Sequence, residues 1–264
     1  MTSIENSDLP LVHALWIGEK LGPVAAACLR SFKRAGHAVV LHSYSDVADL
    51  PAGIQASDAA LIVPRNRIIR HRKTGSFALF SDIFRYELLR RNEGSIYVDC
   101  DVYCVRPIPF ADVIMGYERD GVINGAVLAL PGNSGILADL LQAVNGRRFI
   151  PPWLSHSKAT KLRLNRLLGR QGIEYLPWGS LGPRALTYLA ERHSLLDKAQ
   201  PTDVFYPVDM DRITLLFDPE LSIGDLITPR TKCIHIYNEV VRRQRLVNIP
   251  PTSPLGRMIG ACTG

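Results

Sequence analysis

The first hundred residues alternate between short apolar runs and amphipathic segments, which predicts strands and helices in turn. Leu11–Ile17 and Ala38–Tyr44 are apolar runs with the length and composition of buried strands. Between them, Pro23–Arg34 has a proline near its start, and Gly36 follows its end, as is typical of a helix. A short third strand is predicted at Ala59–Val63. This order of elements predicts an α/β fold built around a mainly parallel sheet.

A longer helix is predicted at Ser76–Arg91. Its apolar residues recur at spacings of three and four and form one stripe, made of Phe77, Phe80, Ile83, Phe84 and Leu88. Glu93-Gly94 ends this helix, and a strand over Ser95–Val98 follows. Near the other end of the chain, the letters CIHIYN alternate as a strand. Two isoleucines lie on its predicted core face and His235 on the opposite face.

The strand after this helix ends in two aspartates one residue apart, in the segment SIYVDCDVYC. Because strand side chains alternate, Tyr97, Asp99 and Asp101 are predicted to point to the same side. Two carboxylates about 7 Å apart on one face repel each other and need a compensating charge. Hard divalent cations such as Mg²⁺ or Mn²⁺ prefer carboxylate oxygens. A metal site is therefore one interpretation; in the other, the acids enter solvent or cap the next turn.

Composition narrows the class of protein and its partners. The 264 residues, 47% of them hydrophobic, suffice for one domain over 1–264 with a sizeable core. No stretch approaches the ~18 apolar residues of a membrane span, and a signal peptide is not expected. Five scattered cysteines without a C-x-x-C pair indicate neither a zinc site nor a disulfide framework, which favours the cytoplasm. The net charge of +6 favours anionic partners, although no nucleic acid is expected.

The helix before the aspartates carries Asp82 and Arg85 on one face, which alone would indicate a surface salt bridge of little energetic value. The combination S-D-x-x-R-Y-x-x-L, a glycine break and I-Y-x-D-x-D resembles the DXD-containing glycosyltransferases of the GT-A type. It is most similar to glycosyltransferase family 32, of the capsular polysaccharide and mannosyltransferase type, and to the glucosylating bacterial toxins. Four weaker blocks, VHALWIG, VINGAVLALPGNSGIL, GSLGPRALT and CIHIYNEVV, follow the order of the family.

The resemblance implies a Rossmann-like GT-A fold, with a mainly parallel sheet flanked by helices and helical insertions in the C-terminal half. It implies a donor-binding half at about 11–130 and an acceptor-side, closing half at about 131–264. The implied activity is metal-dependent transfer of a hexose, with retention at the anomeric carbon. The donor would be a nucleotide diphosphate sugar, with a UDP-sugar as first expectation and GDP-mannose as second. The acceptor would be a glycan or a lipid-linked saccharide, as in polysaccharide biosynthesis.

The resemblance also implies a role for each site residue. Asp101 would bind Mn²⁺ or Mg²⁺ directly, Asp99 would reach the ribose or a metal-bound water, and His235 would add a ligand; a half-buried strand histidine is the alternative. Asp82 and Arg85, catalytic with Asp101, would hold hydroxyls of the donor sugar. The implied donor contacts are Trp16 on the base, Tyr97 along the ribose, Asp82, Arg85, Asp99, Asn124 and Gly182. Core packing for the tryptophan and a plain turn for the asparagine remain alternatives.

Two basic segments lie outside these motifs. Residues 64–76 read as a solvated loop, although Arg65, Arg70 or Lys73 could contact a diphosphate or an acceptor. Residues 157–170 read as a basic amphipathic helix with Lys158, Lys161 and Asn165 opposite Leu164, Leu167 and Leu168. Such a helix either rests on an anionic membrane or packs its leucines onto the core. We therefore expect a cytoplasmic protein, either free or peripherally associated with the inner face of a membrane.

Two other classes of function remain open. A phosphatase of the haloacid-dehalogenase type also has a D-x-D at a strand end, but it needs an N-terminal motif and a later acidic pair. Gly224-Asp225 is a poor candidate for that pair. A non-catalytic nucleotide-sugar or glycan-binding module would keep the fold without turnover.

Overall fold

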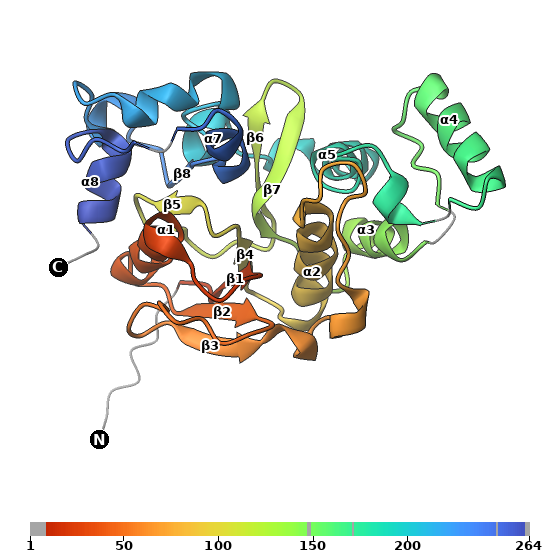
Figure 1. The fold of residues 1–264 in the computed structure, drawn as a ribbon, viewed down its shortest axis with the longest axis horizontal. Coiled ribbons are helices and arrows are strands. Elements are labelled where there is room, and N and C mark those ends of the chain that lie inside the picture. The colour runs from red at the N-terminus through yellow and green to blue at the C-terminus, as the bar shows by residue number, and fades with distance from the viewer. Residues whose placement is uncertain (1–8, 147–148, 171, 247, 262–264) are drawn as a thin grey trace.

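One six-stranded sheet organises the chain, in the order β3-β2-β1-β4-β7-β6 (Figure 1). The computed structural model describes residues 9–146, 149–170, 172–246 and 248–261. The strands are β1 (Val12–Trp16), β2 (Val39–Ser43), β3 (Gln55–Asp58), β4 (Ile96–Val98), β6 (Ile114–Arg119) and β7 (Val122–Ala129). The first four run parallel, whereas β7 pairs antiparallel with both β4 and β6. The sheet is therefore mainly parallel, as predicted.

Helices cover both faces of the sheet because its central strands are apolar on both sides. Val12 and Val98 pack into the core under α1 (Gly22–Arg34), and their neighbours Leu15 and Tyr97 face the opposite core. That second core is covered by α2 (Ala78–Arg91), α3 (Gly135–Asn145) and α5 (Pro183–Arg192). This mixed α/β arrangement is the fold class predicted from the sequence, and it is consistent with a Rossmann-like GT-A fold.

A second, two-stranded sheet joins segments that are far apart in the sequence. Here β5 (Val102–Cys104) pairs antiparallel with β8 (Cys233–His235), with Val102 opposite His235. The backbone N–H of Ile236 also donates to the carbonyl oxygen of Asp101, at 2.8 Å. This pairing brings the late histidine beside the aspartate motif. The other α-helices are α4 (His156–Leu167), α6 (Thr202–Phe205), α7 (Asn238–Arg243) and α8 (Pro254–Gly260), all in the C-terminal half of the chain.

The third predicted strand is misplaced by a few residues. The apolar letters of Ala59–Val63 form a 3-10 turn and the residues that follow it, whereas β3 is the polar segment before them. Asp58 begins the turn by accepting a hydrogen bond from the N–H of Ala60, at 2.9 Å. The edge strand is largely exposed and needs no apolar residues, whereas Ala59 and Val63 are fully buried under the α2-side core.

The predicted stripe on α2 understates how deeply this helix is buried. Phe80 and Phe84 are fully buried, as predicted, but so are most residues on the other sides of the helix. Asp82 and Arg85 are among them, with exposed fractions of 7% and 5%. The interpretation of these two residues as a surface salt bridge is therefore wrong. They form a buried pair on a central helix.

Candidate active site

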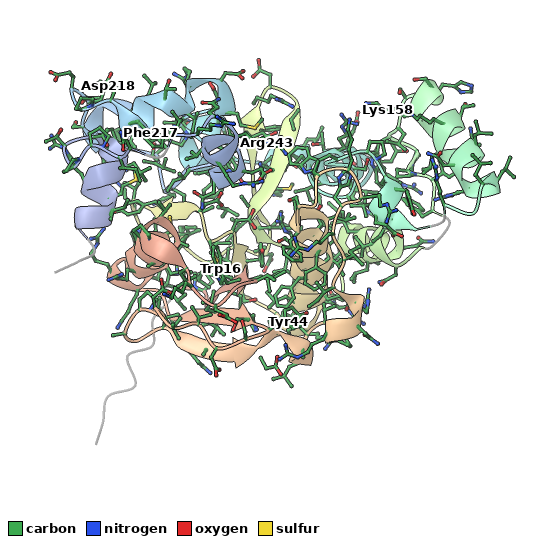
Figure 2. The ribbon with its side chains drawn as sticks, in the orientation of Figure 1. Trp16, Tyr44, Lys158, Phe217, Asp218 and Arg243 are labelled. Atoms are coloured by element: carbon green, nitrogen blue, oxygen red, sulfur yellow. The ribbon has the colours of Figure 1, made fainter. Side chains whose placement is uncertain are left out.

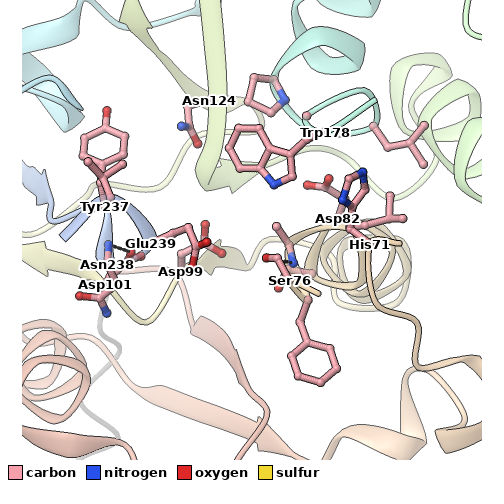
Figure 3. A pocket seen from close by; sticks show the side chains of 18 of the residues that line it. His71, Ser76, Asp82, Asp99, Asp101, Asn124, Trp178, Tyr237, Asn238 and Glu239 are labelled. Atoms are coloured by element: carbon pink, nitrogen blue, oxygen red, sulfur yellow. Dashed lines mark hydrogen bonds between the residues drawn. The ribbon is translucent and has the colours of Figure 1, made fainter. Parts of the chain in front are cut away.

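A cleft of about 630 Å³ opens beyond the carboxyl ends of β1 and β4. Ligands of open α/β sheets bind at this edge, and small-molecule sites have volumes of this order. Its walls come from both halves of the chain: Trp16 after β1, Asp99 and Asp101 after β4, the first turns of α2, and residues 176–181 and 237–240. In Figure 3, Asp99 and Asp101 lie on one side of the cleft and Asp82 and Trp178 on the other.

Asp99, Asp101 and His235 meet on one wall of this cleft. Each offers a ligand atom, and the three atoms lie within 4.8 Å of one another. His235 Nε2 lies 3.2 Å from Asp101 Oδ1, and the N–H of Asn238 donates to Asp101 Oδ2 at 2.8 Å (Figure 3). The structure thus brings His235 beside Asp101, as a shared ligand role would require. These three residues could hold a metal ion.

The chemistry of the three side chains fits a divalent cation. Burial alone would lower the pKa of His235, but Asp101 and Asp99 outweigh burial and raise this pKa. The two carboxylates therefore favour a positive charge at this position. A metal-ligating imidazole must be neutral, so a bound cation would take the place of the imidazole's proton. The Nδ1 of His235 is buried without a hydrogen-bond partner in the described part of the chain. Two carboxylates and one imidazole form a mixed O/N ligand set of the kind that suits Mn²⁺.

Arg85 links the two aspartates that flank it. Its Nη2 donates to Asp99 Oδ1 at 3.0 Å, and its Nη1 lies 3.7 Å from Asp82 Oδ1. The guanidinium also lies 4.8 Å from the centre of the Tyr97 ring. The sequence predicted that this fork holds sugar hydroxyls. In the structure, the guanidinium instead contacts the carboxylates of Asp99 and Asp82, so its contact with a donor sugar stays a prediction. The contact that the structure does contain fixes the position of Asp99.

Asp82 lines the cleft and lies in an unusual electrostatic environment. Burial raises its pKa to about 7, with a further increase from Asp99 and an opposing effect from Arg85. A Cβ on Gly182 would lie 2.9 Å from Asp82 Oδ1, so only glycine allows the start of α5 to pass this close. Gly182 is itself buried and does not line the cleft, so its position gives no support to the predicted contact with the donor.

Three further predicted donor contacts have different outcomes. Tyr97 is only 1% exposed and does not line the cleft, so a contact along a ribose is not supported. Its hydroxyl donates to Asp99 Oδ1 at 3.0 Å, which confirms that the two side chains share one side. Asn124 lines the cleft and donates to Glu118 Oε2 at 2.6 Å. Trp16 lines the cleft as well, while part of its surface packs on the α1-side core.

Several cleft residues were not predicted from the sequence. Trp178 is 47% exposed and points into the cleft in Figure 3. The guanidinium of Arg243 on α7 lies 5.9 Å from its ring. Tyr237 has φ +51°, and its ring packs at a tilt against that of His235, with ring centres 3.9 Å apart. The one local sequence feature that could have indicated Trp178 as a cleft residue is a tryptophan beside a glycine in LPWGS. A lone aromatic residue, however, is more often part of the core.

The basic segment 64–76 contributes to the cleft through other residues than expected. His71 and Ser76 line it, whereas Arg65, Arg70 and Lys73 do not. The guanidinium of Arg70 lies 4.0 Å from the Phe77 ring, and Arg65 donates to the carbonyl oxygen of Tyr44. The expected contact of these cations with a diphosphate therefore has no support in their positions.

No family model matches this chain, and no curated protein matches it. Among solved structures, the PaToxG glycosyltransferase is 14% identical with a TM-score of 0.42, over 72% of this chain and 73% of that chain. The apo structure of the bifunctional glycosyltransferase WbbM is 12% identical with a TM-score of 0.37. That likeness covers 99% of this chain and 53% of the other, so this chain spans about half of WbbM.

Proposed function

We propose that this chain is a metal-dependent glycosyltransferase that moves a hexose from a nucleotide diphosphate sugar to a saccharide acceptor. One observation carries the proposal. The cluster of Asp99, Asp101 and His235 lies in the same cleft as the buried Asp82–Arg85 pair, at the carboxyl ends of the central strands. A cation site beside a polar sugar pocket is the arrangement that such a donor requires.

Asp101 and His235 are the residues that would hold the cation directly, with Mn²⁺ favoured over Mg²⁺ because one ligand is an imidazole. Asp99 fits an outer role, on a ribose hydroxyl or a metal-bound water, because Arg85 already balances its charge at 3.0 Å. When bound, the cation supplies positive charge against the leaving diphosphate. Preorganised charge of this kind is usually the largest contribution to catalysis.

The donor would lie across the carboxyl edge of the sheet. Trp16 at the end of β1 offers an aromatic face to the base, and Asp82 offers hydrogen bonds to the sugar. With a pKa of about 7, this carboxyl group can donate or accept a hydrogen bond near neutral pH. A UDP-sugar remains our first choice and GDP-mannose the second. Trp178, on the opposite wall, would present its exposed face to the acceptor saccharide.

A thermal-shift screen of nucleotide sugars with and without Mn²⁺ tests this function, because a bound donor stabilises the fold by RT ln(1 + [L]/Kd). We expect one donor to raise the melting temperature only with Mn²⁺, and the same donor to be hydrolysed slowly without an acceptor. Stabilisation without any hydrolysis or transfer would favour a non-catalytic binding module. Release of inorganic phosphate from sugar phosphates, without donor hydrolysis, would favour the phosphatase.

Stereochemistry belongs to the same proposal. We propose retention at the anomeric carbon, with the acceptor attacking from the side of the leaving diphosphate, whose oxygen takes the acceptor's proton. No carboxylate in the described cleft can be singled out as an enzymatic nucleophile. NMR of the product decides the point, because an inverted anomeric centre would contradict this route.

A further inference from the structure

Helix α4 exposes three leucines. Leu164, Leu167 and Leu168 have exposed fractions of 58%, 83% and 66%. Leu167 ends the helix and Leu168 caps it, three and four residues after Leu164, so the three share one side. The helix contacts the body of the protein through its other side, where Ala159 and Leu162 are buried in the α2-side core. The alternative that these leucines pack onto the core is therefore wrong. An apolar face of this kind on a peripheral helix calls for a partner.

The charge around this face is of one sign. Successive helical residues are about 100° apart, so Lys161 and Arg163 lie on the two sides of Leu164. Both cations are exposed, as are Lys158 and Arg170. The segment 155–170 contains no aspartate or glutamate. The three leucines are thus bordered by cations on both sides, which is the pattern of helices that lie in a lipid interface.

The partner is inferred from this charge. A second copy of the chain would oppose two cationic helices, and like charges in contact are unfavourable. Anionic lipid headgroups match the cations, while the acyl region next to them accommodates the leucines. We propose that α4 docks this protein on an anionic membrane surface, with the leucines in the interface and the cations among the headgroups.

The position of α4 suits this role. The helix stands at one edge of the molecule in Figure 1, and Lys158 lies far from Trp16 of the cleft in Figure 2. No residue of α4 lines the cleft, so docking through this helix covers none of the lining residues. No helix in the described ranges is long and apolar enough to cross a membrane. The inference is independent of the proposed function, because it rests on exposed side chains outside the cleft.

Vesicle sedimentation tests the proposal directly. The full chain is mixed with vesicles of phosphatidylcholine alone, or with vesicles in which a third of the lipid is phosphatidylglycerol. We expect binding only to the anionic vesicles, weakened at high salt. Leu164→Ser with Leu167→Ser, or Lys161→Glu with Arg163→Glu, should each reduce the affinity by about tenfold or more.

Matched controls have the same chemistry elsewhere. Leu61→Ser with Phe110→Ser removes two large apolar side chains that are 71% and 54% exposed. Lys20→Glu with Arg257→Glu makes the same change in net charge at two exposed positions outside α4. Both controls should bind like the wild type, and all variants should melt like it. The proposal is overturned by equal binding to both vesicles, by no binding, or by a dimer that the leucine variant abolishes.

Discussion

At the scale of single residues, the two aspartates of the D-x-D segment have different surroundings despite their identical chemistry. Asp99 is held by Arg85 and the Tyr97 hydroxyl, whereas Asp101 is held by His235 and a backbone N–H. The alternation of a strand predicted that they share a side, and their ligand atoms do come within reach of one another. The neighbours of Asp99 come from the same stretch of sequence, whereas those of Asp101 lie more than a hundred residues away, where no local pattern could indicate them.

The variant Asp101→Asn tests the inner-ligand role. The amide oxygen can still accept the hydrogen bond from the N–H of Asn238, so the fold should survive. Loss of a charged metal ligand should reduce turnover on the order of a thousandfold. The matched variant Asp99→Asn leaves Arg85 buried with a poorer partner and should lower both turnover and melting temperature. Wild-type turnover of Asp101→Asn in Mn²⁺ would contradict the metal interpretation.

The variant Arg85→Lys tests the buried network. From the sequence alone, this substitution should harm activity far more than stability. Burial of the guanidinium between Asp82 and Asp99 revises that prediction, since one ammonium group cannot replace a planar fork that reaches both carboxylates. We now expect a loss of stability on the order of 1–3 kcal/mol as well as a loss of activity.

The control for this variant is Arg91→Lys on the same helix, at an exposed arginine 3.8 Å from Glu87. Urea unfolding of both variants gives the comparison, because each loses a guanidinium and keeps the charge. If the two are equally stable and only Arg85→Lys loses turnover, the arginine acts on the donor rather than on the network.

At the scale of elements, the periodic apolar segments were predicted well and the polar ones were not. β1, α1 and β2 lie within a residue or two of their predicted bounds because their burial follows their sequence pattern. β3 was missed because an exposed edge strand has no apolar signature. The pairing of β5 with β8 joins positions more than a hundred residues apart, so its register is not encoded in either strand alone.

The pairing of β5 with β8 places His235 beside the D-x-D segment. Substitution of this histidine therefore tests both the residue and the pairing that positions it. His235→Ala should raise the Mn²⁺ concentration needed for half-maximal activity, because one ligand is lost while the backbone pairing with Val102 remains. A direct calorimetric titration with Mn²⁺ should show the same weakening of metal binding. His193→Ala, at a partly exposed histidine paired with Asp139, is the matched control. An unchanged Mn²⁺ requirement with a lower melting temperature would make His235 a packing residue.

At the scale of the whole molecule, the cleft combines one predicted wall with one unpredicted wall. The D-x-D segment and its preceding helix form a contiguous stretch, so their proximity follows from short connections. Trp178 and Arg243 reach the cleft from a loop and from α7, and their contact depends on how the C-terminal helices pack. Sequence reasoning therefore identified the side chains that the motif gathers, and missed those that only tertiary packing brings there.

The stability of the whole molecule should depend on pH through a buried histidine pair. His13 Nδ1 lies 2.9 Å from His42 Nε2 between β1, β2 and α2, and burial lowers the pKa of both rings to about 4, with His42 adding to the effect on His13. Unfolded histidines titrate near 6.5, so below that pH the unfolded chain binds protons that the folded chain does not. The contribution of the two neutral histidines to the folding stability is therefore fully present above about pH 6.5 and is lost as the pH falls toward 4.

Urea unfolding should show that the free energy of unfolding is lower at about pH 5 than at about pH 7.5, by an amount on the order of 2 kcal/mol for each histidine. In His42→Gln the amide can still hydrogen-bond to the His13 ring, and one titrating group is gone. The two histidines together cause part of the difference in unfolding free energy between the two pH values. In the variant, about half of that part should disappear. His156→Gln on the exposed side of α4 controls for the loss of a histidine as such. If His42→Gln keeps the full wild-type difference, the acid sensitivity of the fold arises elsewhere and the pair is not its source.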